Sequence, residues 1–219
     1  MILIFKKYLV LFSAIFFTNF AYAIGVDIFT PLKQTPDRLI NTKISQPDSF
    51  SKSNDLTRKV GSFNVAVGEL LYLKGTITDA FGIPIEGATI QIWQTNSAGQ
   101  YQSLLDDDKY IDENFTMSGT ARSDNLGRYG FKTIFPGFED ERAPHINMII
   151  THPKFTKIET EIYFENHPLN IKDPYYMSYD EEDKKALTAK VVNITNDTKD
   201  GKIATFNIVM DGIHPYKGY

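Results

Sequence analysis

The chain of 219 residues contains no cysteine. Disulfide bonds, thiolate metal sites and cysteine nucleophiles are therefore excluded, and stability has to come from packing. Long cationic runs are also absent, and 23 Lys and Arg residues stand against 27 Asp and Glu residues. Without a basic stretch that attracts polyanions, nucleic acid and anionic membranes are poor candidate partners.

The first 23 residues have the composition of a secretory signal peptide. Lys6 and Lys7 precede an apolar run that ends in Ala21-Tyr22-Ala23, a small-x-small pattern. This order predicts export, with cleavage after Ala23. An uncleaved membrane anchor is the alternative, because the run is only slightly shorter than a bilayer span. The rest of the sequence contains no second apolar segment of that length.

Removing 23 of the 219 residues leaves 196, which is enough for one domain with a hydrophobic core. Loss of Lys6 and Lys7 leaves 21 cationic residues against 27 acidic ones, a formal net charge of −6. Residues 24–60 are polar, contain prolines and show little hydrophobic period. This segment is therefore predicted to be an extended N-terminal arm, and residues 61–219 to be the folded domain.

Short β-branched and aromatic runs dominate the sequence after Glu69, separated by Gly, Pro, Asn and Asp. These runs cover residues 70–79, 88–96, 127–135, 145–152, 160–166 and 203–212. Such runs predict an all-β fold, an antiparallel β-sandwich. One helix is predicted in the C-terminal half: Ser178 stands at capping-box spacing from Glu181, and EEDKKALTAKVV continues for about three turns.

One predicted strand carries a candidate metal ligand. In RAPHINMII, residues 142–150, His145 and Asn147 are two residues apart, so a strand places both on one face. Two histidines at this spacing would suit a metal ion, but only one is present. From these residues alone, a metal site, a damaged metal site and a strand with one polar histidine all stay open.

Several segments carry a resemblance through their order along the chain. They are NDLT (54–57), LKGTITDAFGIPIEGATIQIWQTNSAGQY (73–101), DKYIDENF (108–115), GTARSDNLGRYGFKTIFPG (119–137) and RAPHIN (142–147). In this order they resemble the intradiol ring-cleavage dioxygenase family, and within it the β subunits of protocatechuate 3,4-dioxygenase. The similarity extends from about Asn54 to Gly212 and covers most of the chain.

The resemblance implies a β-sandwich that holds one non-haem Fe(III) between two tyrosinates and two histidines. This iron would activate catechol-type aromatic substrates for attack by O2, because phenolate oxygens stabilise the ferric state and imidazoles complete the shell. Tyr101 matches the first tyrosine ligand, and His145 matches the first histidine. Arg142 matches an arginine close to substrate and metal, and is the candidate catalytic residue.

The other two ligand positions depart from the family pattern. The segment after Pro-Gly offers Phe138 in place of the second tyrosine, and the loop before His145 is short. Asn147 stands where the second histidine is expected. Weak or absent iron binding and impaired ring cleavage are therefore expected, unless other residues such as Tyr110 or Glu161 complete the shell.

Two simpler interpretations stand beside this one. His145 could be a buried neutral histidine that hydrogen-bonds Tyr101, and Arg142 could pair only with Glu139 or Glu141. The corresponding alternative function is a non-catalytic exported sandwich that binds an aromatic or polymeric ligand or a protein partner. Both a homo-oligomer and a hetero-oligomer stay open.

Overall fold

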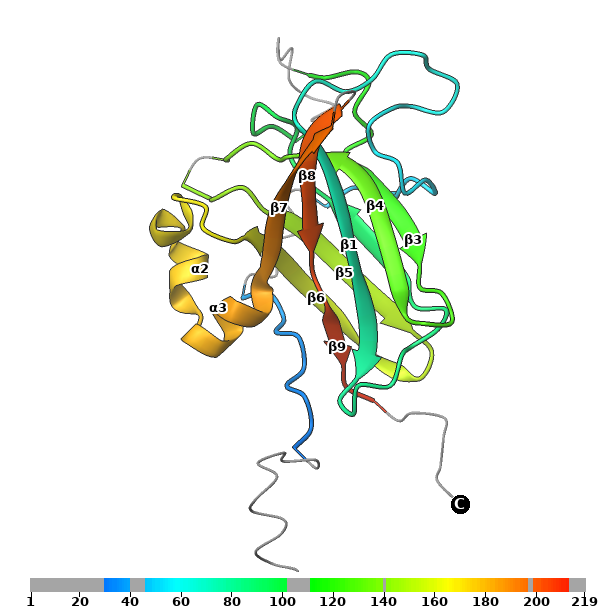
Figure 1. Cartoon of the computed structure of the whole chain (residues 1–219), viewed down its shortest axis with the longest axis vertical. Coiled ribbons are helices and arrows are strands. Elements are labelled where there is room, and N and C mark those ends of the chain that lie inside the picture. The colour runs from blue at the N-terminus through cyan, green and yellow to red at the C-terminus, as the bar shows by residue number, and fades with distance from the viewer. Residues whose placement is uncertain (1–29, 40–45, 102–110, 140, 197–198, 213–219) are drawn as a thin grey trace, which may run out of the picture. The chain divides into compact units, whose positions relative to one another are not determined.

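The computed structural model describes residues 30–39, 46–101, 111–139, 141–196 and 199–212. The chain divides into Met1–Pro31, of which only residues 30 and 31 are described, and Leu32–Tyr219, which holds all the described helices and strands (Figure 1). No helix among the described residues has the length and apolar character needed to cross a membrane.

The second unit is a β-sandwich, as the sequence predicted. Its strands are β1 (Leu70–Asp79), β2 (Thr89–Trp93), β3 (Ser118–Arg122), β4 (Arg128–Ile134), β5 (Ile146–His152), β6 (Phe155–Phe164), β7 (Thr188–Asn196), β8 (Lys199–Thr205) and β9 (Ile208–Met210). Their order is β3-β2-β5-β6-β7-β8-β1-β4, and β9 pairs with β1. A short parallel pairing of β6 with β7 connects the layer β3-β2-β5-β6 to the layer β8-β1-β4.

The central core lies between these two layers, and strands of both layers direct apolar side chains into it. Leu71 and Leu73 of β1 face inward, and Ile90 and Ile92 of β2 come from the opposite layer. Met148 of β5 is fully buried in the same core. Burial of such side chains is the main favourable contribution to folding, at roughly 25 cal/mol per Å² of apolar surface.

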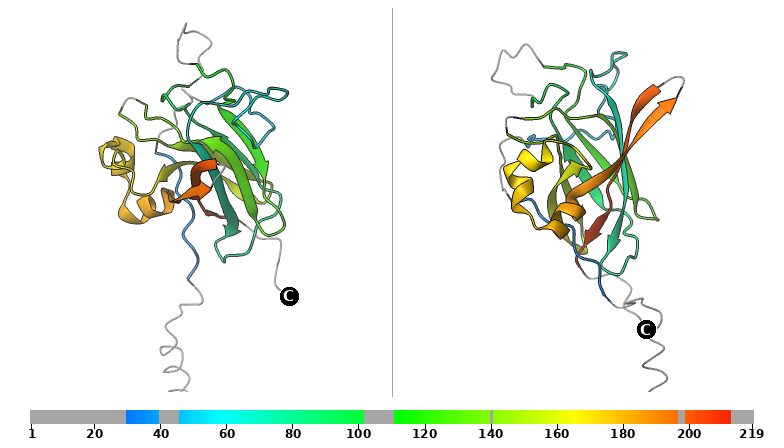
Figure 2. Two further views of the ribbon diagram at one scale, coloured as in Figure 1. Left: turned by 45° about the horizontal axis from the view of Figure 1, so that its top comes forward. Right: turned by 60° about the vertical axis from the view of Figure 1, so that its left-hand side comes forward.

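Two strands differ from the sequence-based prediction. None of the six predicted runs covers β3, whose SGTAR sequence lacks large apolar residues and which pairs fully with β2; only the turn at Asn125 and Gly127 indicated a strand before it. The predicted three-turn helix was wrong in length, because Thr188 begins β7 and pairs with Tyr163 of β6. The β-branched residues of VVNIT favour a strand, and β7 continues as a hairpin with β8 that extends from the sandwich (Figure 2, right).

Short helices lie beside the junction of β6 and β7 (Figure 1). They are η1 (Asn170–Lys172), α2 (Pro174–Ser178) and α3 (Glu181–Leu187). The N-cap of α3 is Asp180, whose side chain accepts a hydrogen bond from the Asp183 amide, so the predicted cap at Ser178 was wrong. Asp173 caps α2 by accepting hydrogen bonds from the two amides that follow Pro174.

The N-terminal segment 32–39 runs along the sandwich through backbone hydrogen bonds. Leu32 donates to the carbonyl of Ala80, Thr35 donates to Val209, and Arg38 donates to the Glu159 carbonyl of β6. The Arg38 guanidinium lies 5.3 Å from the centre of the Trp93 ring and forms an ion pair with Glu159. This segment therefore helps to cover Trp93 and β6 on the side away from the central core.

Candidate active site

The outer face of the β2-β5-β6 layer, defined by Trp93, His145, Asn147, Glu161 and Tyr163, points away from the central core. Asn147 pairs with Trp93 on one side and with Glu161 on the other. His145 lies two residues before Asn147 and Tyr163 two residues after Glu161, so both share this face. All five side chains are at most 5% exposed. Several polar groups are thus buried together here.

Tyr101 reaches this face from the turn after β2. The side chain of Asn96 shapes that turn by accepting hydrogen bonds from the amides of Ala98 and Gln100. The hydroxyl of Tyr101 then accepts a hydrogen bond from the side-chain amide of Asn147, at 3.0 Å. The structure therefore brings Tyr101, which matches a family ligand in sequence, into contact with Asn147, which stands where the second histidine was expected.

Phe138 contributes its backbone, and not its ring, to this region. A Cβ added at Gly99, which has φ +81°, would meet the Phe138 carbonyl oxygen at 1.9 Å, so only glycine fits there. The Phe138 side chain is 61% exposed. The backbone of this position lies close to the turn that leads to Tyr101, while its aromatic ring is largely in solvent.

Arg142 forms a buried charge network with residues of β6 and α2. Its guanidinium donates to Glu161 at 2.7 Å, to Asp173 at 2.9 Å and to the Tyr163 hydroxyl at 2.9 Å. It also stacks on Tyr175, 4.4 Å from the ring centre. Arg142 therefore does not pair only with Glu139 or Glu141, because its ion pairs include these distant carboxylates.

Asp173 is the residue of this network that the sequence analysis missed. It is fully buried, and its Oδ2 accepts from both Arg142 and the Ala143 amide while its Oδ1 caps α2. The Asp-Pro pair at 173–174 is a helix-start signal that could have indicated the cap. No sequence signal indicated the pairing with Arg142, which is 31 residues away.

His145 is held as a neutral imidazole. Its Nδ1 lies 2.8 Å from the carbonyl oxygen of Ala143, and because a carbonyl can only accept, Nδ1 carries the proton. The lone pair is therefore on Nε2. Burial lowers the pKa of His145, and the positive charge of Arg142 lowers it further. A hydrogen bond from Nδ1–H to a backbone carbonyl is common among metal-binding histidines. The same bond also provides the hydrogen-bond partner that a buried structural histidine needs, so it fits both interpretations of His145.

The phenol of Tyr163 is held in its protonated form. Burial raises the pKa of Tyr163, and the nearby Glu161 carboxylate raises it further. The Tyr163 hydroxyl donates to Glu161 at 2.9 Å and accepts from Arg142. This tyrosine is thus a hydrogen-bonded member of the charge network, and its environment disfavours a phenolate.

The side chains that the structure describes do not make up the four-ligand Fe(III) set that the resemblance implies. Tyr101 and His145 are two of those donors, while the buried carboxylates Glu161 and Asp173 are paired with Arg142. Among the residues that the structure describes, no group of three or more His, Cys, Asp or Glu could hold a metal ion. Tyr110, the other residue considered as a ligand, lies outside the described residues.

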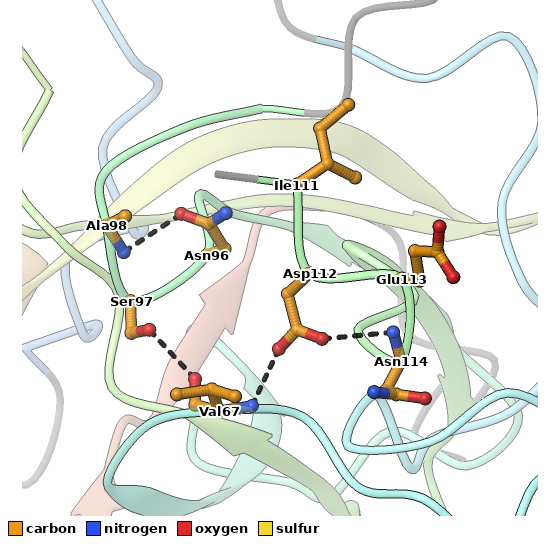
Figure 3. Close-up of a pocket in the computed structure, with 8 residues that line it drawn as sticks. All are labelled: Val67, Asn96, Ser97, Ala98, Ile111, Asp112, Glu113 and Asn114. Carbon is orange, nitrogen blue, oxygen red and sulfur yellow. Dashed lines mark hydrogen bonds between the residues drawn. The ribbon is translucent and has the colours of Figure 1, made fainter. Parts of the chain in front are cut away.

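A separate open pocket of about 430 Å³ lies between the turn after β2 and the segment before β3 (Figure 3). Its acidic residues include Asp112, whose carboxylate accepts from the amides of Val67 and Asn114. The Ser97 hydroxyl, also in the pocket wall, donates a hydrogen bond to the Val67 carbonyl. The drawn hydrogen bonds tie the pocket wall together, and the Asp112 carboxylate is engaged in holding two loops.

Comparison with known families agrees with this fold and with the order of the segments. A family model described as Dioxygenase matches residues 47–212, more than half of the chain. The protocatechuate 3,4-dioxygenase beta chain of Burkholderia cepacia is 29% identical over 168 residues, which cover 73% of this chain and 72% of that relative. The chain therefore belongs to the intradiol ring-cleavage dioxygenase family, whose members use iron.

Further relatives extend this result. A Rickettsia felis protein with a provisional dioxygenase name is 30% identical over 152 residues, 63% of this chain and 73% of that relative. The dioxygenase domain of a carbohydrate-binding fusion protein from Streptomyces sp. SirexAA-E superposes with a TM-score of 0.63 at 22% identity, covering 83% of this chain and 100% of that domain. The 3-chlorocatechol 1,2-dioxygenase of Rhodococcus opacus 1CP gives 0.66 at 17% identity, covering 83% and 74%. These structural similarities establish the fold.

Proposed function

We propose that this chain is an exported intradiol-family protein whose Fe(III) binding and catechol cleavage are weakened or lost. The observation that carries the proposal is the hydrogen bond from the Asn147 amide to the Tyr101 hydroxyl. An amide donor stands where the resemblance requires an imidazole, and it engages the remaining tyrosine. Neutral amide oxygen is also a much poorer donor to iron than imidazole nitrogen.

The loss at position 138 supports the same proposal. A phenylalanine supplies neither an anionic oxygen nor a proton acceptor, and its ring is largely in solvent. Changes in the residues that merely orient metal ligands cost about 10 to 100-fold in affinity or activity. Replacing two of the ligands themselves should therefore cost more.

A non-catalytic binding module is the second candidate function, and the pairing of Arg142 favours it. Glu161 and Asp173 both form ion pairs with this arginine, so its charge is balanced within the protein. An arginine held in this way is less available to a substrate carboxylate than an unpaired one. In this proposal Arg142 positions Tyr163 and Glu161, and the ligand is an aromatic or polymeric molecule or a protein partner.

Export is part of the proposal because of the leader at residues 1–23. Outside the cytoplasm, the protein would meet substrates apart from an intracellular catabolic pathway. The test should therefore use protein recovered from its native compartment, with the N-terminus determined. Processing as proposed gives Ile24 as the first residue.

The experiment compares the natural protein with Asn147→His and Phe138→Tyr. Iron is measured by metal analysis and by the visible absorption of tyrosinate bound to Fe(III), and turnover by oxygen uptake with catechol and protocatechuate. We expect little iron and no turnover in the natural protein. Asn147→His should gain iron, since it returns a strong donor two residues from His145. Phe138→Tyr should gain less, because its side chain points largely to solvent.

Asn193→His is the matched control, since it adds an exposed histidine to β7, away from Tyr101 and His145 in the sequence. Stoichiometric iron with rapid ring cleavage in the natural protein would overturn the proposal. Equal iron gain by Asn147→His and Asn193→His would show that position 147 is not a former ligand site.

A further inference from the structure

The loop before β1 exposes an unusual group of apolar side chains. In residues 58–67, here called the apolar loop, four large side chains are solvent-exposed: Val60 (95%), Phe63 (100%), Val65 (51%) and Val67 (70%). Single exposed apolar residues are normal on soluble proteins, whereas four of them within one short loop make that loop a candidate interaction site. The loop is the cyan segment at the upper right of Figure 1.

Hydrogen bonds hold the base of the apolar loop, so its exposure does not come from a loose chain. The Ala66 amide donates to the Thr57 carbonyl at 2.7 Å and closes the loop. On its far side, Val67 donates to Asp112 and accepts from Ser97. The residue before Thr57, Leu56, is fully buried in the core. Both ends are thus anchored on the sandwich.

A tight turn then presents the apolar tip. The Ser62 amide donates to the Lys59 carbonyl, which places Val60 and Gly61 at the centre of a β-turn. Gly61 has φ +83°, the left-handed value that glycine adopts easily. A residue at the corner of such a turn projects outward, which agrees with the 95% exposure of Val60.

Two cations adjoin this tip. Arg58 and Lys59 are both exposed, and neither forms an ion pair with an acid among the residues that the structure describes. The chain as a whole is acidic, with a formal net charge of −4. The positive charge is therefore local to the tip of the loop, whereas the other end of the loop lies beside Asp112 and Glu113 through Val67.

We propose that the apolar loop docks the protein on an anionic lipid surface, with Val60 and Phe63 inserted at the interface and Arg58 and Lys59 beside the headgroups. A projecting tip suits a bilayer interface, because lipids rearrange around it and no complementary groove is needed. Apolar side chains and adjacent cations contribute together to binding of this kind. The overall charge of the sequence argued against an anionic membrane as a partner. The placement of these four residues in one loop is the observation that favours such a membrane.

The test measures co-sedimentation of the processed protein with vesicles of phosphatidylcholine alone or with about one third phosphatidylglycerol. We expect binding to the anionic vesicles at low salt, weaker binding at high salt, and little binding to phosphatidylcholine. Phe63→Ser should lower the partition coefficient about tenfold, since it removes one inserted aromatic side chain. Lys59→Ser should lower binding to anionic vesicles and reduce its salt dependence.

Phe81→Ser is the matched control, because Phe81 is 75% exposed in the turn between β1 and β2, at the other end of β1. It should bind like the natural protein. Phe63→Trp should shift its fluorescence to the blue when anionic vesicles are added, whereas Phe81→Trp should not. Failure of the natural protein to bind anionic vesicles at low salt would overturn the proposal. So would equal binding by Phe63→Ser, or a dimer that dissociates on that substitution, which would identify a second copy as the occupant.

Discussion

Met148 and Asn147 are neighbours on β5, and both are almost completely buried, with 0% and 3% of their surfaces exposed. Met148 points into the central core between the two layers, where it belongs to a cluster of buried apolar side chains. Asn147 points to the outer face, where it donates to Tyr101 and lies beside the paired charges of Arg142 and Glu161. One strand thus has a largely apolar buried region on one side and a buried region with several polar side chains on the other.

This difference separates the interactions that stabilise the sandwich from those that arrange the candidate site. The inner face is stabilised by the hydrophobic effect. This stabilisation is roughly proportional to the apolar area removed from water and does not require a particular orientation of the contacting groups. The outer face is stabilised by hydrogen bonds and ion pairs, each of which needs one particular partner. A substitution on the outer face, at Asn147 for example, should therefore leave the packing that Met148 represents largely undisturbed.

The largest expected effect comes from breaking the charge network of the outer face. Arg142→Met leaves the carboxylates of Glu161 and Asp173 buried without their cation, which should lower the free energy of unfolding by about 3–5 kcal/mol. Adding Glu161→Gln to this variant should recover part of the loss, because one uncompensated charge disappears. Urea unfolding of the single and double variants measures both effects.

Arg128→Met is the control for this comparison. Arg128 pairs with Asp124 in an exposed ion pair, its side chain being 62% accessible, and such pairs contribute at most about 1 kcal/mol. If Arg142→Met costs no more than Arg128→Met, the network does not stabilise the outer face.

A smaller effect separates the two faces of β5 directly. Met148→Ala removes core volume and should cost about 2–5 kcal/mol, whereas Met148→Leu keeps most of the volume and should cost less than about 1.5 kcal/mol. Asn147→Ala removes its hydrogen bond to Tyr101, which is worth about 0.5–1.5 kcal/mol. The same unfolding measurement should therefore rank Met148→Ala above both other variants. Equal losses for Met148→Ala and Asn147→Ala would contradict the division into two kinds of face.

Most of the fold could be predicted because alternation along a strand is visible locally. The predicted run 70–79 coincides with β1, and each of the other predicted runs overlaps at least one strand. The strand β3 is absent from the predicted runs because Ser118–Arg122 carries no large apolar residue, and its pairing with β2 is what defines its extent. Helix and strand were confused at Thr188, where the apolar pattern of α3 continues directly into β7.

The candidate site was less predictable because its contacts join distant positions. Tyr101 and Asn147, 46 residues apart, meet through a hydrogen bond that neither residue's neighbours indicate. Arg142 was compared with acids three and one residues away, but its ion pairs go to Glu161 and Asp173, which are 19 and 31 residues away. Only the register of β5 on β6 and the position of α2 bring these groups together.

The smallest predicted effect is a pH dependence that belongs to the outer face. Burial and the charge of Arg142 lower the pKa of His145 in the folded protein, whereas an unfolded histidine has a pKa of about 6.5. Because the pKa of His145 is lower in the folded protein, the unfolded chain binds a proton more readily as the pH falls below that value, and stability falls with it. This loss is at most about 1.4 kcal/mol at pH 5.5, one unit below the unfolded pKa. His145→Gln should therefore reduce the decrease in unfolding free energy between pH 7.5 and pH 5.5.

The control for this effect is His152→Gln, because the pKa values of His152 and His167 are also lowered by burial, although both side chains are only partly buried. Carboxylates whose pKa lies below the ordinary range, such as Asp55 and Asp124, do not titrate in this interval. His152→Gln should consequently retain most of the decrease in unfolding free energy between pH 7.5 and pH 5.5, whereas His145→Gln should lose much of it. If both variants lost as much unfolding free energy between pH 7.5 and pH 5.5 as the natural protein, His145 would not be the source of the pH dependence. The titrating group would then have to lie elsewhere in the protein.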